Sequence, residues 1–205
     1  MPGLFLSLDG LDGTGKSTQG RLLADWLREL GHQVTECRDP GGTPLGDQFR
    51  AIVLDNRSDI SAATEAFLFM ASRSELVAKI IRPALTANHI VICDRFLLAT
   101  IVYQGHAGGL DVEALRKMGE LATGGIMPQL TFVFDIPVET AVLRRNRDAD
   151  RLESRALDYH ERVRAGFLQE AKCNADTIRV IDASESIEDI QHRIRDLVQP
   201  LLTKA

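Results

Sequence analysis

Residues 10–17 read Gly-Leu-Asp-Gly-Thr-Gly-Lys-Ser, a full match to the pattern G-x-x-x-x-G-K-[ST]. The residues before it, Gly3–Asp9, form an apolar run that predicts a buried strand, and residues 16–30 have apolar side chains at helical spacing. A strand, a glycine-rich turn and a helix, in this order, are the context of a phosphate-binding loop, or P-loop. Its backbone N–H groups and the helix N-terminus surround phosphate oxygens. The chain is therefore predicted to bind a nucleoside triphosphate; the alternative is a coincidental glycine-rich turn.

The rest of the chain alternates between strand-like and helix-like segments. Strands are predicted at 3–9, 33–37, 89–93, 130–135 and 177–181, and helices at 16–30, 45–54, 61–87, 111–123, from Pro137, at 156–172 and from Ser186. Parallel strands need helical crossovers, so this alternation predicts an α/β fold with a five-stranded parallel sheet and helices on both faces. With its P-loop, this is the P-loop NTPase fold. We expect one domain over residues 1–205, because no repeat or linker interrupts the pattern.

Composition excludes several other classes of protein. The 205 residues are 44% hydrophobic and 26% charged, with a net charge of −5, which argues against disorder and against a basic nucleic-acid-binding surface over the whole domain. The three cysteines show no C-x-x-C spacing, and the five histidines show no metal or triad spacing. No apolar stretch approaches the ~20 residues that cross a bilayer. We expect a cytoplasmic protein without nucleic-acid or membrane partners, and histidines that are structural or exposed.

Residues in the P-loop and after the strand at 89–93 define the phosphate chemistry. In the loop, Lys16 would reach the β- and γ-phosphates and the Ser17 hydroxyl would bind Mg²⁺. Asp94 follows the strand predicted at 89–93, where P-loop proteins have an acid that faces the metal. Arg95 comes next, where a hydrolysing ATPase often has a second acid. An arginine suits a transferase better, because it can hold an acceptor phosphate through two hydrogen bonds. The alternative for Asp94-Arg95 is an ion-paired surface turn.

Arginines are concentrated in residues 144–151, which contain four of them, with Arg155 shortly after. Beside a phosphate site, such a segment can form a lid that brings guanidinium groups to the transferred phosphoryl group and excludes water. The alternative is a solvated helix face with Asp–Arg pairs.

Phe69 and Arg73 fall on one stripe of the helix predicted at 61–87, together with Leu76 and Ile80. An arginine on an apolar face needs a partner, because an unpaired buried charge is very costly. A bound anion or a polar base would supply one. The two residues therefore make a candidate ligand site, although Phe69 alone is also explained as a core residue.

These motifs, in their order and spacing, resemble those of the thymidylate kinases from Leu4 to the last helix. They are GLDGTGKST, Asp39-Pro40-Gly41-Gly42-Thr43, Phe69-x-x-x-Arg73, Asp94-Arg95-Phe96, Tyr103-Gln104-Gly105 and the lid arginines. Gly13 inside the P-loop, with arginines in the lid, is similar to the bacterial type, whereas the other type has an arginine in the P-loop. The resemblance implies a single nucleoside monophosphate kinase domain with a lid at about 144–155.

The resemblance also implies the reaction and its participants. The enzyme would move the γ-phosphate of ATP to dTMP, giving dTDP and ADP for dTTP synthesis, with Mg²⁺ and as a homodimer. A nucleoside monophosphate has a second pKa near ~6, so its phosphate oxygen is already an ionised nucleophile at neutral pH. The work of the enzyme would be alignment and charge neutralisation.

Individual roles carry over from the same resemblance. Phe69 would stack on thymine, and Arg73 would bind the carbonyl edge of the base. Gln104 would contact the base, and Tyr103 would disfavour a ribose 2′-hydroxyl. The implied dTMP-binding residues are Asp12, Arg50, Phe69, Arg73, Arg95, Thr100, Tyr103 and Gln104. The implied ATP-binding residues are Gly10, Leu11, Asp12, Gly13, Thr14, Gly15, Lys16, Ser17, Thr18, Arg147 and Arg151. The catalytic group would be Asp12, Lys16, Arg95 and Arg147, and the metal ligands Ser17, Asp12 and Asp94.

Three positions depart from the family pattern. Asp9 and Asp39 stand where glutamate is usual, so that a metal contact would become water-mediated. Ala99-Thr100 replaces a Ser-Ser or Ser-Thr pair, which leaves Thr100 as the only hydroxyl.

Other functions fit the sequence less well. A GTPase switch would explain Asp39-Pro40-Gly41-Gly42 as D-x-x-G, but no N-K-x-D or T-K-x-D sequence follows. A pure ATP-binding module would not explain the pair of Phe69 and Arg73. A deoxynucleoside 5′-hydroxyl kinase is the closest rival; it would need a general base, which Asp12 or an acid at a strand end could supply.

Overall fold

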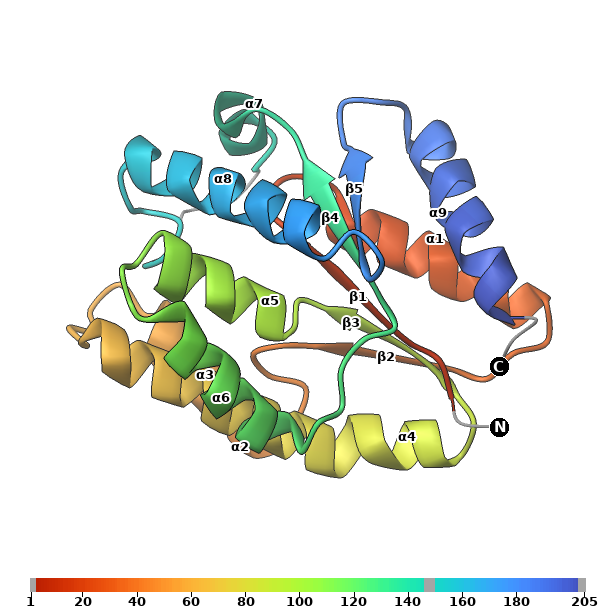
Figure 1. Cartoon of the computed structure of the whole chain (residues 1–205), viewed down its shortest axis with the longest axis horizontal. Helices are drawn as coiled ribbons and strands as arrows, with labels where there is room; N and C mark the ends of the chain where they lie inside the picture. The colour runs from red at the N-terminus through yellow and green to blue at the C-terminus, as the bar shows by residue number, and fades with distance from the viewer. Residues whose placement is uncertain (1–2, 146–149, 203–205) are drawn as a thin grey trace.

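The computed structural model describes residues 3–145 and 150–202. Its centre is a parallel sheet of five strands in the order β2-β3-β1-β4-β5 (Figure 1). The strands are β1 (Phe5–Gly10), β2 (Val34–Arg38), β3 (Ile90–Asp94), β4 (Leu130–Asp135) and β5 (Ile178–Asp182). The predicted parallel sheet is confirmed, with strand ends that shift by one or two residues.

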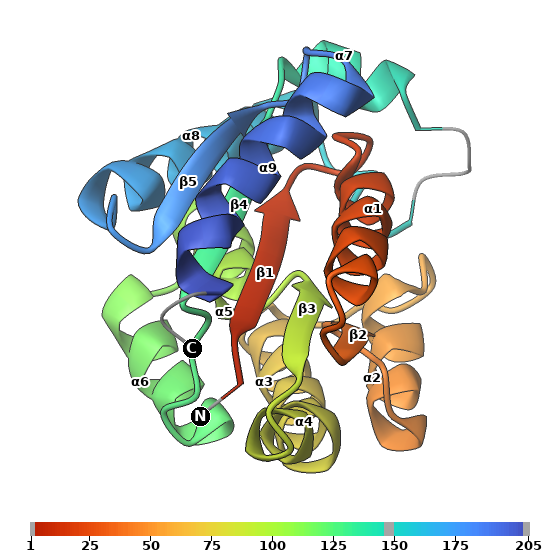
Figure 2. The same ribbon diagram turned by 90° about the vertical axis from the view of Figure 1, so that its right-hand side faces the viewer.

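The strand order decides where ligands can bind. After β1 the chain forms β2 and β3, which lie on one side of β1 within the sheet. It then forms β4 and β5, which lie on the other side of β1 (Figure 2). Strand order therefore reverses beside β1, and in open α/β sheets ligands bind at such a point, outside the carboxyl ends of the strands. The P-loop begins there, because it directly follows β1.

Helices cover both faces of the sheet, as predicted. One face carries α1 (Lys16–Glu29) and α9 (Ile187–Leu202), which contact each other (Figure 1). The other carries α3 (Ala62–Leu76), α4 (Arg82–Thr86), α5 (Leu97–Thr100) and α8 (Leu157–Cys173). The remaining α-helices of the described residues are α2 (Pro44–Leu54), α6 (Val112–Thr123) and α7 (Val138–Leu143). None of the helices in the described ranges has both the length and the apolar character to span a bilayer.

Apolar side chains fill the space between these layers. One cluster joins the β1 residues Leu6 and Leu8 to α1 and α9, and a second surrounds Phe5 under α3 and α4. The rings of Phe5 and Phe96 meet edge to face, with centroids 4.9 Å apart. Full burial of each such side chain contributes roughly 1.5–3 kcal/mol. This packing anchors the segment after β3 that carries part of the site.

Three details of the helices differ from the predictions. The helix expected at 61–87 contains a π-helical turn, η1 (Val77–Ile81), between α3 and α4. Pro83 follows this turn and has no N–H to continue the α-helical ladder, which accounts for the local change of period. Pro137, predicted to begin a helix, is the N-cap of α7 with extended backbone, φ −51° and ψ 138°.

The third difference is a helical segment that the sequence did not predict. Helix α5 continues directly into the π-helical turn η2 (Ile101–His106). Almost all residues of 97–105 are buried, so the segment has no polar face and shows no amphipathic period. It matters because Thr100, Tyr103 and Gln104 belong to it.

Candidate active site

The P-loop is closely packed under α7. Gly13 has φ 88°, and a Cβ atom there would lie 2.2 Å from the carbonyl oxygen of Ala141. Only glycine fits this position. Lys16 is buried, and its Nζ donates to the Leu11 carbonyl at 2.7 Å. Burial, and next the neighbouring Arg95, lowers the pKa of Lys16. The loop thus holds its ammonium group at the turn that would surround the phosphates.

The predicted metal ligands lie at the end of this loop. The Ser17 hydroxyl donates to Asp94 Oδ2 at 2.9 Å, so these two residues are brought together as expected. Asp12 instead pairs with Arg95, 3.0 Å away, and its other oxygen is 4.0 Å from Lys16. A hydroxyl and carboxylates are hard oxygen donors that fit Mg²⁺, which usually keeps several waters and substrate phosphates as ligands. The described residues hold no cluster of three or more His, Cys, Asp or Glu side chains for a metal, consistent with such a shared site.

Asp9 lies at the end of β1 beside these groups. Both of its carboxyl oxygens are buried and make no hydrogen bond within the described part of the chain. Burial raises the pKa of Asp9 to about 7, although Arg95 and Lys16 oppose the rise. The Asp9 carboxyl, which has no hydrogen-bond partner among the described residues, thus lies near the positive charges of Arg95 and Lys16.

Arg95 has an unusual backbone, and its guanidinium is buried and ion-paired with Asp12. Its φ of 66° lies in the left-handed region, which is rare outside glycine and is often found at functional sites. The guanidinium lies 5.2 Å from the ring centroid of Tyr103. Neither Nη1 nor Nη2 makes a well-formed hydrogen bond among the described residues, although both are buried. Buried donors of this kind are suited to an anion such as a phosphate.

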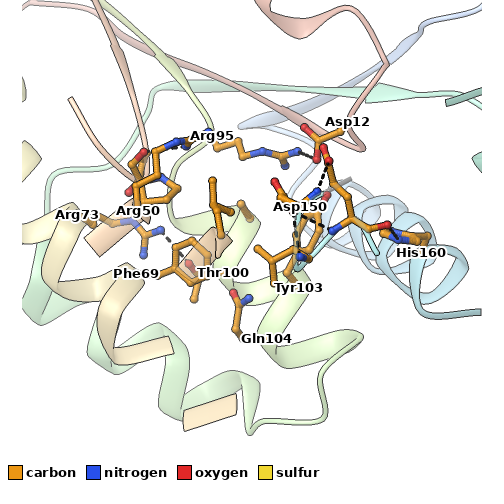
Figure 3. Close-up of a pocket in the computed structure, with 16 residues that line it drawn as sticks. Asp12, Arg50, Phe69, Arg73, Arg95, Thr100, Tyr103, Gln104, Asp150 and His160 are labelled. Carbon is orange, nitrogen blue, oxygen red and sulfur yellow. Dashed lines mark hydrogen bonds and ion pairs between the residues drawn. The ribbon is translucent and has the colours of Figure 1, made fainter. Parts of the chain in front are cut away.

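A cavity of about 70 Å³ extends from Asp12 in the P-loop to side chains of α3 and η2 (Figure 3). All eight predicted dTMP-binding residues line it. The lining residues are Asp12, Asp39, Pro40, Arg50, Leu54, Phe69, Arg73, Arg95, Ala99, Thr100, Tyr103, Gln104, Asp150, Leu152, Glu153 and His160. In Figure 3, Arg73 and Phe69 lie at one end, and Arg95 and Asp12 face each other at the opposite end.

Arg73 has a protein partner that the sequence analysis did not identify. Its Nε donates to Asp39 Oδ2 at 2.6 Å, and its Nη2 donates to the Thr100 hydroxyl at 2.8 Å. The buried charge therefore has a partner in the protein itself, and contact of Arg73 with a bound anion or base stays a prediction. Asp39 lies 34 residues earlier, and only the parallel pairing of β2 with β3 brings it under α3. The pair fixes the guanidinium at the wall of the cavity.

The arginine-rich segment is divided between two cavities. Arg147 lies outside the described residues. Arg144 and Arg145, which were not among the predicted site residues, line a cleft of about 440 Å³ over the P-loop. Arg151, predicted to bind ATP, lines neither cavity; it pairs with Glu65 and donates to the Val53 carbonyl at 2.8 Å. Contact between Arg151 and ATP stays a prediction that requires it to leave Glu65.

The sequence analysis missed further residues that line the cavity. Asp150, Leu152 and Glu153 belong to the segment predicted as the lid, and His160, which was expected to be structural or exposed, belongs to α8. The ring Nε2 of His160 lies 3.2 Å from the carbonyl oxygen of Glu153. No periodicity marks these residues, because they reach the cavity from a turn and from the first turn of α8. Only the dense charge of 144–155 pointed to this region.

Comparison with known proteins gives a consistent result. A sequence model of the thymidylate kinase family matches residues 8–194. The chain is 46% identical to a thymidylate kinase of Symbiobacterium thermophilum, covering 98% of this chain and 95% of that protein. It is 45% identical to one of Rhodopirellula baltica, covering 94% and 79%. A crystal structure of thymidylate kinase from Ehrlichia chaffeensis superposes with a TM-score of 0.79 at 30% identity, covering 97% and 99%. With its P-loop, its paired Arg73 and these relatives, the chain belongs to the thymidylate kinase family.

Proposed function

We propose that this chain transfers the γ-phosphate of ATP to dTMP, giving dTDP and ADP on the route to dTTP. The observation that carries the proposal is that two cavities share a lining residue. Asp12 lines both the P-loop cleft and the cavity that contains Phe69 and Arg73. A donor phosphate and an acceptor phosphate could therefore meet at Asp12 and Arg95. Membership of the thymidylate kinase family supports this reaction over hydrolysis or phosphorylation of a 5′-hydroxyl.

The side chains of the acceptor cavity can recognise each part of dTMP. The Phe69 ring, only 7% exposed, offers an apolar face for the base. Arg73 keeps one Nη1 hydrogen for a base carbonyl, because its other donors bind Asp39, Thr100, the Phe96 carbonyl and Met70 Sδ. The Tyr103 ring would crowd the sugar, and Arg50, whose Nη1 donates to the Pro40 carbonyl at 3.0 Å, would add positive charge.

The transfer itself requires alignment more than proton movement. The dTMP phosphate is already ionised at neutral pH, since its second pKa is near ~6. Lys16 would hold the donor phosphates, and the Arg95 guanidinium, which lies 3.0 Å from Asp12, would hold the acceptor phosphate. Arg147 would close over the transferred group. These cations would offset negative charge as it spreads in the transition state.

We also propose Mg²⁺ as the metal that accompanies ATP. Ser17 and Asp94 would hold it through their oxygens, with Asp12 nearby. When bound, the ion neutralises charge on the β- and γ-phosphates. The Ser17–Asp94 hydrogen bond of 2.9 Å supports this choice, because it keeps two oxygen ligands at the loop's end.

A coupled assay of ADP release with ATP and Mg²⁺ tests the proposed reaction. Its arms are dTMP, dUMP, AMP, thymidine and no acceptor. We expect strong turnover with dTMP and little without acceptor. Equal turnover in all arms would mean hydrolysis, and turnover with thymidine but not with dTMP would mean a nucleoside kinase.

Two features of the cellular form are also proposals. We propose a homodimer, supported by strongly exposed apolar side chains on neighbouring helices, such as Phe67 of α3 at 62% and Leu121 of α6 at 87%. Light scattering after gel filtration measures the mass directly.

We propose the cytoplasm as the location, because Cys37, Cys93 and Cys173 are free thiols, as is usual in a reducing compartment.

A further inference from the structure

Glu65 is a buried carboxylate behind Gln104, a residue that lines the acceptor cavity. It lies in the first turn of α3, is 1% exposed and was not among the predicted site residues. Its Oε1 accepts a hydrogen bond from Gln104 Nε2 at 2.8 Å. Its Oε2 accepts from Arg151 and, at 2.8 Å, from Arg155. Gln104 of η2 and two arginines of residues 150–155 thus donate hydrogen bonds to one side chain.

This arrangement fixes the orientation of the Gln104 amide. A carboxylate paired with two guanidinium groups can only accept hydrogen bonds, so the amide must direct its NH₂ group toward Glu65. Gln104 is itself 2% exposed and lines the acceptor cavity. Its side-chain oxygen Oε1 accepts no hydrogen bond in the described part of the chain. The free end of Gln104 is therefore an acceptor, and a reversed amide would lose its bond to Glu65.

A hydrogen-bond acceptor at this point would distinguish pyrimidine bases by whether their N3 atom carries a hydrogen. Thymine and uracil carry a hydrogen on N3, whereas N3 of cytosine is itself an acceptor. A carbonyl oxygen facing N3 would bind the first two and leave two acceptors opposed with the third. A site with buried polar groups rejects an analogue that leaves them unpaired.

We propose that Glu65 is a positioning residue that sets base selection by holding the Gln104 carbonyl oxygen toward N3 of the acceptor base. The inference rests on the proposed function, since it assigns a role within the dTMP site. Arg151 and Arg155 act in it by holding the Glu65 carboxylate in place. Glu65 makes no contact with the base and acts through Gln104.

Substitution Glu65→Gln tests this role. The new amide can donate as well as accept, so Gln104 can reverse and present NH₂ to the base. The measurement is kcat/KM for dTMP, dUMP and dCMP. We expect the preference for dTMP over dCMP to fall by about tenfold or more, while Arg73 retains part of it. The ratio of dTMP to dUMP should stay unchanged, because both bases carry the N3 hydrogen.

Glu170→Gln is the matched control. Glu170 is 4% exposed and also binds two basic side chains, His106 and Arg116, but it does not line the acceptor cavity. The control removes a buried charge of the same kind and should keep the wild-type preference for dTMP over dCMP. A merely structural role for Glu65 would make the two variants alike in this ratio, and that result would overturn the proposal.

Two further results keep the inference separate from the proposed function. If the wild-type protein does not phosphorylate dTMP, the proposed function fails. If it prefers dTMP but Glu65→Gln keeps that preference, only the role of Glu65 fails. Should Glu65→Gln not fold, Gln104→Met removes the amide itself; it must reduce the preference for dTMP over dCMP to a similar extent, and an unchanged preference would overturn the proposal.

Discussion

The donor and acceptor ends of this site are built in different ways. The P-loop end consists of consecutive residues, 10–18, whose backbone and Lys16 face a cleft of about 440 Å³. The acceptor end is a cavity of about 70 Å³ whose walls come from segments between Asp12 and His160. Buried ion pairs hold those walls, above all Arg73 with Asp39 and Glu65 with Arg151.

The difference teaches where stability and chemistry coincide. At the donor end, a local turn supplies most of the polar groups, and Lys16 makes its hydrogen bond within that turn, so its side chain can be lost without breaking a distant hydrogen bond. At the acceptor end, the groups that would read dTMP also join separate elements of the fold. Breaking a buried pair leaves an uncompensated charge, which is strongly destabilising. Substitutions should therefore affect activity at one end, and both activity and stability at the other.

Arg73→Ala should have the largest combined effect. It leaves Asp39 buried without its partner, so we expect a loss of about 3–5 kcal/mol in the free energy of unfolding and a severe loss of dTMP binding. Urea denaturation and dTMP titration measure the two. The double variant Arg73→Ala/Asp39→Ala should be more stable than Arg73→Ala alone. Equal stability of the single and double variants would show that the pair is not what holds this wall.

Lys16→Met should remove chemistry without removing the acceptor site. Loss of the cation that would hold the donor phosphates is expected to lower kcat by about 10³-fold. The dissociation constant for dTMP should stay within about twofold of wild type, because Lys16 does not line the acceptor cavity. Lys172→Met, at an exposed position of α8, is the control and should retain full turnover. A large loss of dTMP affinity in Lys16→Met would contradict the separation of the two ends.

Asp94→Asn should weaken the binding of Mg²⁺. Loss of the carboxylate that binds Ser17 should raise the Mg²⁺ concentration for half-maximal activity by about 10–100-fold. Steady-state rates over a Mg²⁺ titration measure it, and EDTA should abolish turnover of the wild-type protein. Asp182→Asn at the exposed end of β5 is the control. The same Mg²⁺ dependence in both variants would remove Asp94 from the metal site.

Asp9→Asn should have the smallest effect, on pH dependence. Burial raises the pKa of Asp9 to about 7, so above its unfolded pKa the folded state binds more protons than the unfolded state. The resulting stabilisation is complete below pH 3.8 and is lost as pH rises through about 7. Between about pH 6 and pH 8 this group costs the wild-type protein about 1 kcal/mol. Denaturation at both pH values should show a smaller decrease in Asp9→Asn, and equal decreases would contradict the raised pKa.

Much of the fold followed from local patterns. Alternation of apolar strands with amphipathic helices gave five parallel strands, because each pattern reflects burial on a particular face. The helical segment 97–106 was not predicted, since burial on nearly all sides removes any period. The π turn before Pro83 was also missed, because neighbouring helical periods differ too little in one turn to be recognised.

The sequence by itself determined the P-loop and the family, because a phosphate-binding turn depends on consecutive residues whose spacing is visible in the chain. Through the resemblance to the thymidylate kinases it also named eight of the residues that line the acceptor cavity. Only the tertiary structure decided which charges meet: Arg73 with Asp39, Gln104 and Arg151 with Glu65, and Arg95 with Asp12. A buried charge is stable only with a partner, and a partner from another element is found by the packing of the whole chain rather than by local spacing.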